Sequence, residues 1–168
     1  MKQHRYGSAE LNHPECVKVL LDKHSASINA TNNFGDTALH RAAMKGNLDV
    51  VKLLTTYRRC DVSAKNKHND TPLHCAALAG NDALISVLIQ HGAEVNERGK
   101  FGRTALHNAC SHGHVACIHE LMRHGADVEA RADEREATPL QMAARSNHRA
   151  CTRALLEKYS ASINTTIS

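Results

Sequence analysis

The sequence predicts an all-α solenoid, a row of helical pairs that stack on one another with loops projecting between them. Three observations support this prediction. One short motif occurs four times, its threonines Thr37, Thr71, Thr104 and Thr138 are 33 or 34 residues apart, and each motif precedes a second stretch with apolar residues at helical spacing. Units of this kind contact only their neighbours, so we expect one elongated array over residues 1–168 rather than a globule with a single centre.

The motif consists of a polar residue, a threonine, a run of small residues and a closing glycine. The threonine predicts a helix N-cap, and the glycine predicts a left-handed residue that ends the helix. In the last copy Asn147 replaces that glycine, and asparagine also tolerates a left-handed backbone, so this unit should still fold. The loop before Thr138 holds one extra residue. The four copies are 36–46, 70–80, 103–113 and, more loosely, 137–147.

A second helix is predicted after each motif, and a further one before the first motif. Pro14 suits the first turn of that further helix, where its missing N–H removes no hydrogen bond. The predicted repeats are 1–28, which is degenerate because it lacks a recognisable motif, 29–62, 63–95, 96–128 and 129–163. The predicted second helices are 15–22, 48–55, 83–91, 115–123 and 149–157.

A T-P-L-H-x-A core with a period near 33 resembles the ankyrin-repeat family, and the resemblance covers roughly residues 10–164. It implies helix–turn–helix units whose connecting loops project as β-hairpin fingers. It also implies that His40, His74 and His107 bridge the loops of neighbouring repeats through hydrogen bonds. The function that it implies is protein–protein interaction.

The ends of the second helices depart from the family pattern in three repeats. Gly92 and Gly125 keep the glycine that closes the helix, whereas His24, Arg58 and Tyr159 take its place and the turn gains one residue. Our hypothesis is that the extra residue makes a wider turn that needs no left-handed residue.

Composition excludes several classes of protein. With 21 basic and 17 acidic residues the net charge is +4, less than a nucleic-acid-binding domain usually carries. No run of about 18 apolar residues or basic–apolar leader is present, so we expect neither a membrane span nor secretion. The six cysteines lack paired short spacing, which favours a reducing compartment, the cytoplasm or nucleus. We expect a monomer without a cofactor, and a fragment of a longer protein, because neither end shows a polar cap.

The repeat pattern explains the candidate metal-binding and catalytic residues better than a chemical function does. The string Cys110-x-His112-x-His114-x2-Cys117 resembles zinc-ligand spacing, but each residue except His112 fills a slot of the repeat. We therefore predict no metal site. No nucleophile motif or phosphate-binding loop is present, so we predict no catalytic residue and no enzyme. The setting of Asn96 resembles that of ankyrin asparagines that a cellular oxygenase hydroxylates, but we favour the interpretation that Asn96 hydrogen-bonds the turn.

The resemblance implies that the concave face binds the partner. Its free positions are the finger residues, the residue after the motif histidine and the two before the closing glycine. The predicted partner-binding residues are Asn33, Phe34, Asp36, Arg41, Met44, Lys45, Lys67, His68, Asp70, Leu78, Lys100, Phe101, Arg103, Ser111, His112 and Arg135.

Two features of this set suggest how it works. Phe34 and Phe101 occupy the same finger slot and are either interface anchors or packing on the adjacent finger. The third and fourth fingers are basic, with few acids nearby, which favours an acidic or phosphorylated partner in a scaffold, adaptor or substrate-recruiting protein. Two alternatives stay open: nucleic acid or a phosphorylated small ligand on the basic fingers, and a passive spacer.

Overall fold

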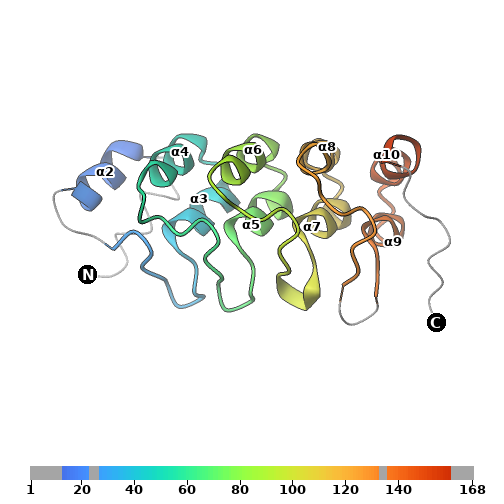
Figure 1. Ribbon diagram of the computed structural model, residues 1–168, viewed down its shortest axis with the longest axis horizontal. Helices are drawn as coiled ribbons and strands as arrows, with labels where there is room; N and C mark the ends of the chain where they lie inside the picture. Colours follow the sequence, from blue (N-terminus) through green and yellow to red (C-terminus); the bar gives the residue numbers. More distant parts are fainter. Residues whose placement is uncertain (1–12, 23–26, 133–135, 160–168) are drawn as a thin grey trace.

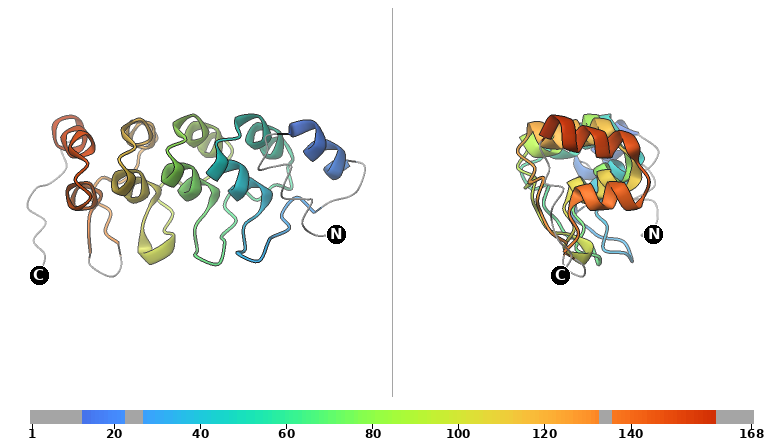
Figure 2. Two further views of the ribbon diagram at one scale, coloured as in Figure 1. Left: turned by 180° about the vertical axis from the view of Figure 1, so that it is seen from behind. Right: turned by 90° about the vertical axis from the view of Figure 1, so that its right-hand side faces the viewer.

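The computed structural model describes residues 13–22, 27–132 and 136–159 and shows two layers of helices in a row (Figure 1). One layer holds the motif helices, and the other holds the second helices. Loops project from the side of the motif helices (Figure 2). The motif helices are α3 (Ala38–Lys45), α5 (Pro72–Ala79), α7 (Ala105–His112) and α9 (Pro139–Arg145). The second helices are α2 (Pro14–Asp22), α4 (Leu48–Thr56), α6 (Asp82–Gln90), α8 (Val115–Arg123) and α10 (Arg149–Tyr159).

Each layer stacks in chain order, so the predicted solenoid is confirmed. Helix α3 packs on α5, α5 on α7 and α7 on α9, and the second helices follow the same order. The stacking surfaces are made of small residues: Ala42, Ala76, Ala109 and Ala143 are fully buried. Small side chains let the helices approach closely at the packing density of a protein interior.

The motif helices end as their sequence predicts. Gly46, Gly80 and Gly113 have φ values between +76° and +82°, and Asn147 takes the same left-handed conformation with φ +58°. Asparagine is among the few side chains that accept this backbone, so the fifth unit closes without a glycine.

The second helices end in two ways. After α6, Gly92 has φ +98° and the N–H of Ala93 donates to the carbonyl of Leu88 at 3.0 Å, which closes the helix in the usual left-handed motif. After α4, Arg58 does not have a positive φ, and the turn closes instead through a bond from the Cys60 N–H to the Tyr57 carbonyl at 2.8 Å. The wider-turn hypothesis therefore holds at Arg58. His24 lies outside the described residues.

The expected β-hairpins do not form in the part of the chain that the structure describes, because no strand is present there. Each finger is a loop closed by one backbone hydrogen bond across its base, and a short 3-10 turn (η1, Lys100–Gly102) forms the fourth tip. A single backbone hydrogen bond does not make the ladder of a β-hairpin. The fifth finger encloses one residue more than the others, as predicted. The bonds run from the N–H of Asn32, Asn66, Gly99 and Ala132 to the carbonyls of Asp36, Asp70, Arg103 and Ala137.

Side chains and backbone link each finger to the next. The Lys67 N–H donates to the Phe34 carbonyl at 3.0 Å, and the Lys100 N–H donates to the Asp70 carboxylate at 2.9 Å. At Gly99 a Cβ atom would lie 2.4 Å from that carboxylate, so only glycine allows the approach. The fingers are therefore held as a row beside the motif helices.

No helix within the described ranges is both long enough and apolar enough to cross a bilayer.

Candidate functional site

A groove of about 440 Å³ runs along the concave face between the fingers and the motif helices of the second to fourth repeats. Its wall comes from the finger tips and its floor from α3, α5 and α7. The lining residues are Phe34, Asp36, Arg41, Met44, Asn66, His68, Asp70, His74, Cys75, Leu78, Lys100, Phe101, Arg103 and Asn108.

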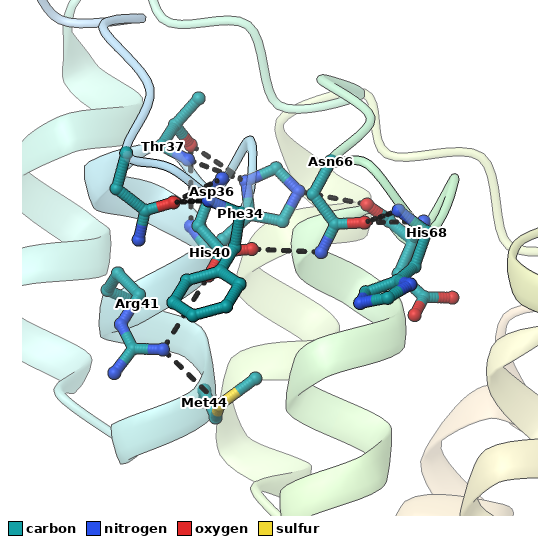
Figure 3. A network of polar contacts seen from close by, with 10 residues as sticks. Phe34, Asp36, Thr37, His40, Arg41, Met44, Asn66 and His68 are labelled. Carbon is teal, nitrogen blue, oxygen red and sulfur yellow. Dashed lines mark hydrogen bonds and ion pairs between the residues drawn. The ribbon is translucent and has the colours of Figure 1, made fainter.

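Three buried histidines position the fingers over the groove. In the first, the Thr37 N–H donates to Nδ1 of His40 at 3.2 Å, and Nε2 of His40 donates to the carbonyl of Asp70 at 2.9 Å (Figure 3). His74 and His107 make the same bonds one and two repeats further along. The bridging role implied by the family resemblance is confirmed.

Burial makes these histidines structural groups. It lowers the pKa of His40 and His74 and lowers the pKa of His107 to about 4. A ring that accepts at Nδ1 and donates at Nε2 is neutral. All its polar atoms are engaged, so we assign these imidazoles to the scaffold.

Charges at the N-terminal end of the groove are balanced within the protein. The Asp36 carboxylate is buried, accepts from Nδ2 of Asn66 at 2.9 Å and pairs with Arg41 at 3.6 Å. Figure 3 shows Asn66 reaching Asp36 from the next finger, and Arg41 also reaching the sulfur of Met44. A buried carboxylate with two donors is a stable arrangement, and it leaves no excess charge there.

The C-terminal end has a different electrostatic character. Lys100 Nζ lies 5.0 Å from the centre of the Phe101 ring and the Arg103 guanidinium carbon lies 5.6 Å from it, both within cation–π range. Phe101 itself has a left-handed backbone with φ +58°. Nε of Arg103 is buried without a hydrogen-bond partner. This wall of the groove therefore carries positive charge and an exposed ring.

The groove also has exposed apolar surface. Phe34 is 63% exposed, Phe101 45% and Leu78 36%, so the rings do not pack away against the adjacent fingers. The thiol of Cys75 is buried in the floor, and burial raises its pKa to about 12. It is a small apolar residue rather than a nucleophile.

The structure brings most of the predicted residues together but not all. Asn33, Lys45 and Lys67 do not line the groove, and Arg135 lies outside the described residues. Ser111 and His112 line a second hollow beside it. The ten predicted residues that line the groove are Phe34, Asp36, Arg41, Met44, His68, Asp70, Leu78, Lys100, Phe101 and Arg103.

Four residues line the groove that are not in the predicted partner-binding set: Asn66, His74, Cys75 and Asn108. Asn66 has a sequence signal, because Asn32 occupies the same finger slot and both side chains accept from the backbone of their own finger. Asparagine is favoured where a side chain must close such a turn. His74 was assigned to the scaffold alone, although it also lines the groove.

The expectation that the basic fingers have few acids nearby is wrong at Lys65. Its ammonium group lies 2.7 Å from the Glu97 carboxylate in the next repeat, and this hydrogen bond lowers the pKa of Glu97. The pairing follows from stacking, because residues about one repeat apart lie side by side. The excess positive charge of the groove therefore comes from Lys100 and Arg103 rather than from Lys65.

The residues of the zinc-like string do not gather at one point, although the rings of His112 and His114 stack. Cys110 and Cys117 are buried in the core, and Nε2 of His114 bonds the carbonyl of Leu78 at 3.1 Å. Across the described ranges no three potential ligands gather as a metal site would require. Asn96 bonds the next turn, donating to the carbonyl of Gly125 at 3.2 Å and accepting from the Asp127 N–H at 2.8 Å.

Comparison with known proteins places the chain in a family. The model described as "Ankyrin repeats (3 copies)" matches residues 6–99 and again residues 94–167, and no curated protein matches the chain. The two matches span nearly the whole sequence and coincide with the stacked helix pairs described above. The chain therefore belongs to the ankyrin-repeat family.

Proposed function

We propose that this chain is a non-catalytic module that binds one protein partner, as a monomer, by holding an extended segment of that partner in the concave groove. Ankyrin repeats as a class are protein–protein interaction modules. The observation that carries the proposal is the groove itself, in which Phe34, Leu78 and Phe101 are exposed on a frame of hydrogen-bonded fingers. Exposed aromatic residues on a rigid frame are typical interface anchors.

The frame supports this function because it is organised before the partner arrives. Bonds between fingers, such as Lys67 N–H to Phe34 carbonyl and Asn66 to Asp36, hold the tips in place. A preformed site does not lose binding energy to its own ordering. A role as a scaffold, adaptor or substrate-recruiting protein in the cytoplasm or nucleus is consistent with such a module.

The test compares two variants in quantitative affinity purification from the source cell. The groove variant Phe34→Ala/Leu78→Ala/Phe101→Ala removes the apolar anchors. The control variant Lys52→Ala/Glu94→Ala/Arg149→Ala changes exposed residues away from the groove. We expect the groove variant to lose the main partner at least tenfold while the control keeps it, with both retaining wild-type helical circular dichroism.

Two results would favour other functions. If every partner is retained by the groove variant, the concave face is not the binding site and a spacer role gains support. If the retained ligand is a nucleic acid, its affinity will fall steeply with salt, because phosphate contacts release bound counterions.

A further inference from the structure

A second hollow of about 290 Å³ adjoins the groove on the same face, one step further toward the C-terminal end. It lies between the end of α7, which supplies Ser111 and His112, and the end of α9. Arg103 lines both hollows, so the two meet at this side chain. The lining residues are Arg103, Ser111, His112, Met142, Arg145 and Ser146.

The described lining of this hollow contains two cations and no acid. Arg103 and Arg145 line it, and no carboxylate is found among its described lining residues. Within the described ranges neither guanidinium forms an ion pair. At the N-terminal end of the groove the cation is offset, because Arg41 pairs there with Asp36. An unbalanced pair of cations in a concave surface attracts an anion.

Arg103 has an unused hydrogen-bond donor at this point. Its Nε is buried and has no hydrogen-bond acceptor, and leaving a buried N–H of a charged group unpaired is unfavourable. The Ser111 hydroxyl donates to the Asn108 carbonyl at 3.0 Å, and His112 stacks on His114 with the ring centres 6.2 Å apart. Among the described lining residues Arg103 and Arg145 carry the permanent positive charges, so their guanidinium groups are the donors best suited to an anion.

We propose that the hollow between Arg103 and Arg145 binds a phosphorylated serine or threonine of the segment that occupies the groove. This inference rests on the proposed function. A phosphate group carries a charge of about −1.5 to −2 and three acceptor oxygens, which matches two guanidinium forks. A carboxylate carries a single charge and satisfies one fork, so the phosphate is the better complement.

The stacking of the repeats also sets the position of the phosphate in the partner. The exposed apolar floor lies between α3 and α5, at Met44 and Leu78, and the hollow lies two helix steps away, between α7 and α9. Packed helices are about 8–10 Å apart, so the two points are separated by roughly 16–20 Å. An extended chain advances about 3.3 Å per residue. The phosphorylated residue should therefore lie about five or six residues from the apolar anchor.

The test uses three fluorescent peptide pools that share a fixed leucine and random flanking residues. Six positions from the leucine, in both chain directions, the pools carry phosphoserine, glutamate or serine. Fluorescence anisotropy with the full chain should show that the phosphoserine pool binds at least tenfold more tightly than the serine pool, with glutamate close to serine. Moving the phosphoserine to two positions from the leucine should abolish the advantage.

Variants of the chain test which residues produce the preference for phosphoserine. Arg103→Gln/Arg145→Gln should remove the preference for phosphoserine, and so, in part, should Arg145→Gln alone, which changes only an exposed residue. The matched control Arg149→Gln/Arg153→Gln removes two charges from α10 and should keep the preference. In amide NMR spectra, inorganic phosphate should shift Ser111 and Ser146 in the wild type and not in the double variant.

The outcomes separate this inference from the proposed function. Equal binding of the three pools, including no binding of any, overturns the phosphate site, as does a preference that survives Arg103→Gln/Arg145→Gln. Glutamate equal to phosphoserine makes it a carboxylate site and overturns the assignment to phosphate. If Phe34→Ala/Phe101→Ala leaves the binding of all pools unchanged, the groove proposal fails, while a phosphoserine preference that needs the two arginines still stands.

Discussion

The two ends of the concave face share one backbone design and differ in one slot. The residue before the motif threonine is Asp36 in the second repeat and Asp70 in the third, and it is Arg103 in the fourth. Asp36 and Asp70 each bond the next finger, through Asn66 and through the Lys100 N–H. Among the described residues the side chain of Arg103 makes no such bond to the next finger, and its Nε is left unpaired.

This difference shows how a repeat protein acquires a specific surface. The helices, the caps and the histidine bridges recur because every unit must stack on its neighbour. The slot joins neighbouring fingers in the second and third repeats, whereas in the fourth repeat its side chain makes no bond to the described part of the next finger, so a residue of opposite charge is accepted there. The positive charges therefore lie at positions whose side chains are not needed to hold the repeats together. These positions are Lys100, Arg103 and Arg145.

The largest expected effect is a loss of stability at acidic pH. It tests whether both ends of the concave face depend on the same buried histidines. Burial lowers the pKa of all three histidines, so the unfolded chain binds more protons below about pH 6.5. Stability is full above that pH and falls as the pH drops toward 4. For His107 alone, the change from 6.5 to about 4 corresponds to roughly 3 kcal/mol. Urea unfolding between pH 7.5 and 4.5 measures this loss.

The chain supplies its own control for that measurement. Gln141 occupies the histidine slot of the last motif and accepts from the Thr138 N–H at 3.0 Å without titrating in this range. We expect His107→Gln to keep the cap and to reduce the dependence of stability on pH. A pH dependence that is unchanged in this variant would show that the acid sensitivity arises elsewhere.

A smaller effect on stability compares the two ends of the concave face directly. Asp36→Ala should destabilise the chain by about 1–2 kcal/mol, because it leaves the buried amide of Asn66 unpaired. Arg103→Ala should change the free energy of unfolding by less than about 0.5 kcal/mol, because its Nε has no partner to lose. Urea unfolding of the two variants at pH 7.5 provides the measurement. Equal losses would contradict the contrast between the two ends.

The smallest expected effect concerns the two phenylalanines. Phe34→Ala should be neutral within about 0.5 kcal/mol, since the ring is mostly exposed. Phe101→Ala should destabilise slightly more, because its ring contacts Lys100 and Arg103. Thermal unfolding followed by circular dichroism resolves the difference. A large loss at Phe34 would mean that this ring serves the fold rather than a partner.

Local signals in the sequence were sufficient for the helices, their order and their ends. Thr37 and its equivalents predicted the caps, and Asn147 predicted a left-handed residue without glycine, because capping and backbone preference depend on neighbours in the chain. The shape of the fingers was not predictable in this way. Whether two chain segments form a ladder depends on several paired bonds, and here one bond per finger closes the loop.

The candidate groove was predictable in outline because repeated positions lie in register along a stack. Ten of the predicted residues line it, whereas Lys67 points elsewhere and Asn66 was missed. The ion pair of Lys65 with Glu97 was not predicted either, although the two residues lie about one repeat apart. A periodic pattern tells which slots are free, but not which side chains of adjacent repeats satisfy one another.

The sequence by itself determined the repeat, the helical pairs and the family, since these depend on motif, period and local backbone preference. Only the tertiary structure decided which charges remain unbalanced on the concave face. That balance depends on distances between side chains of different repeats, at Asp36 with Asn66, Lys65 with Glu97 and Arg103 with no acceptor. The interaction energy of two charges falls with distance and rises with burial, and neither quantity can be read from the order of the residues.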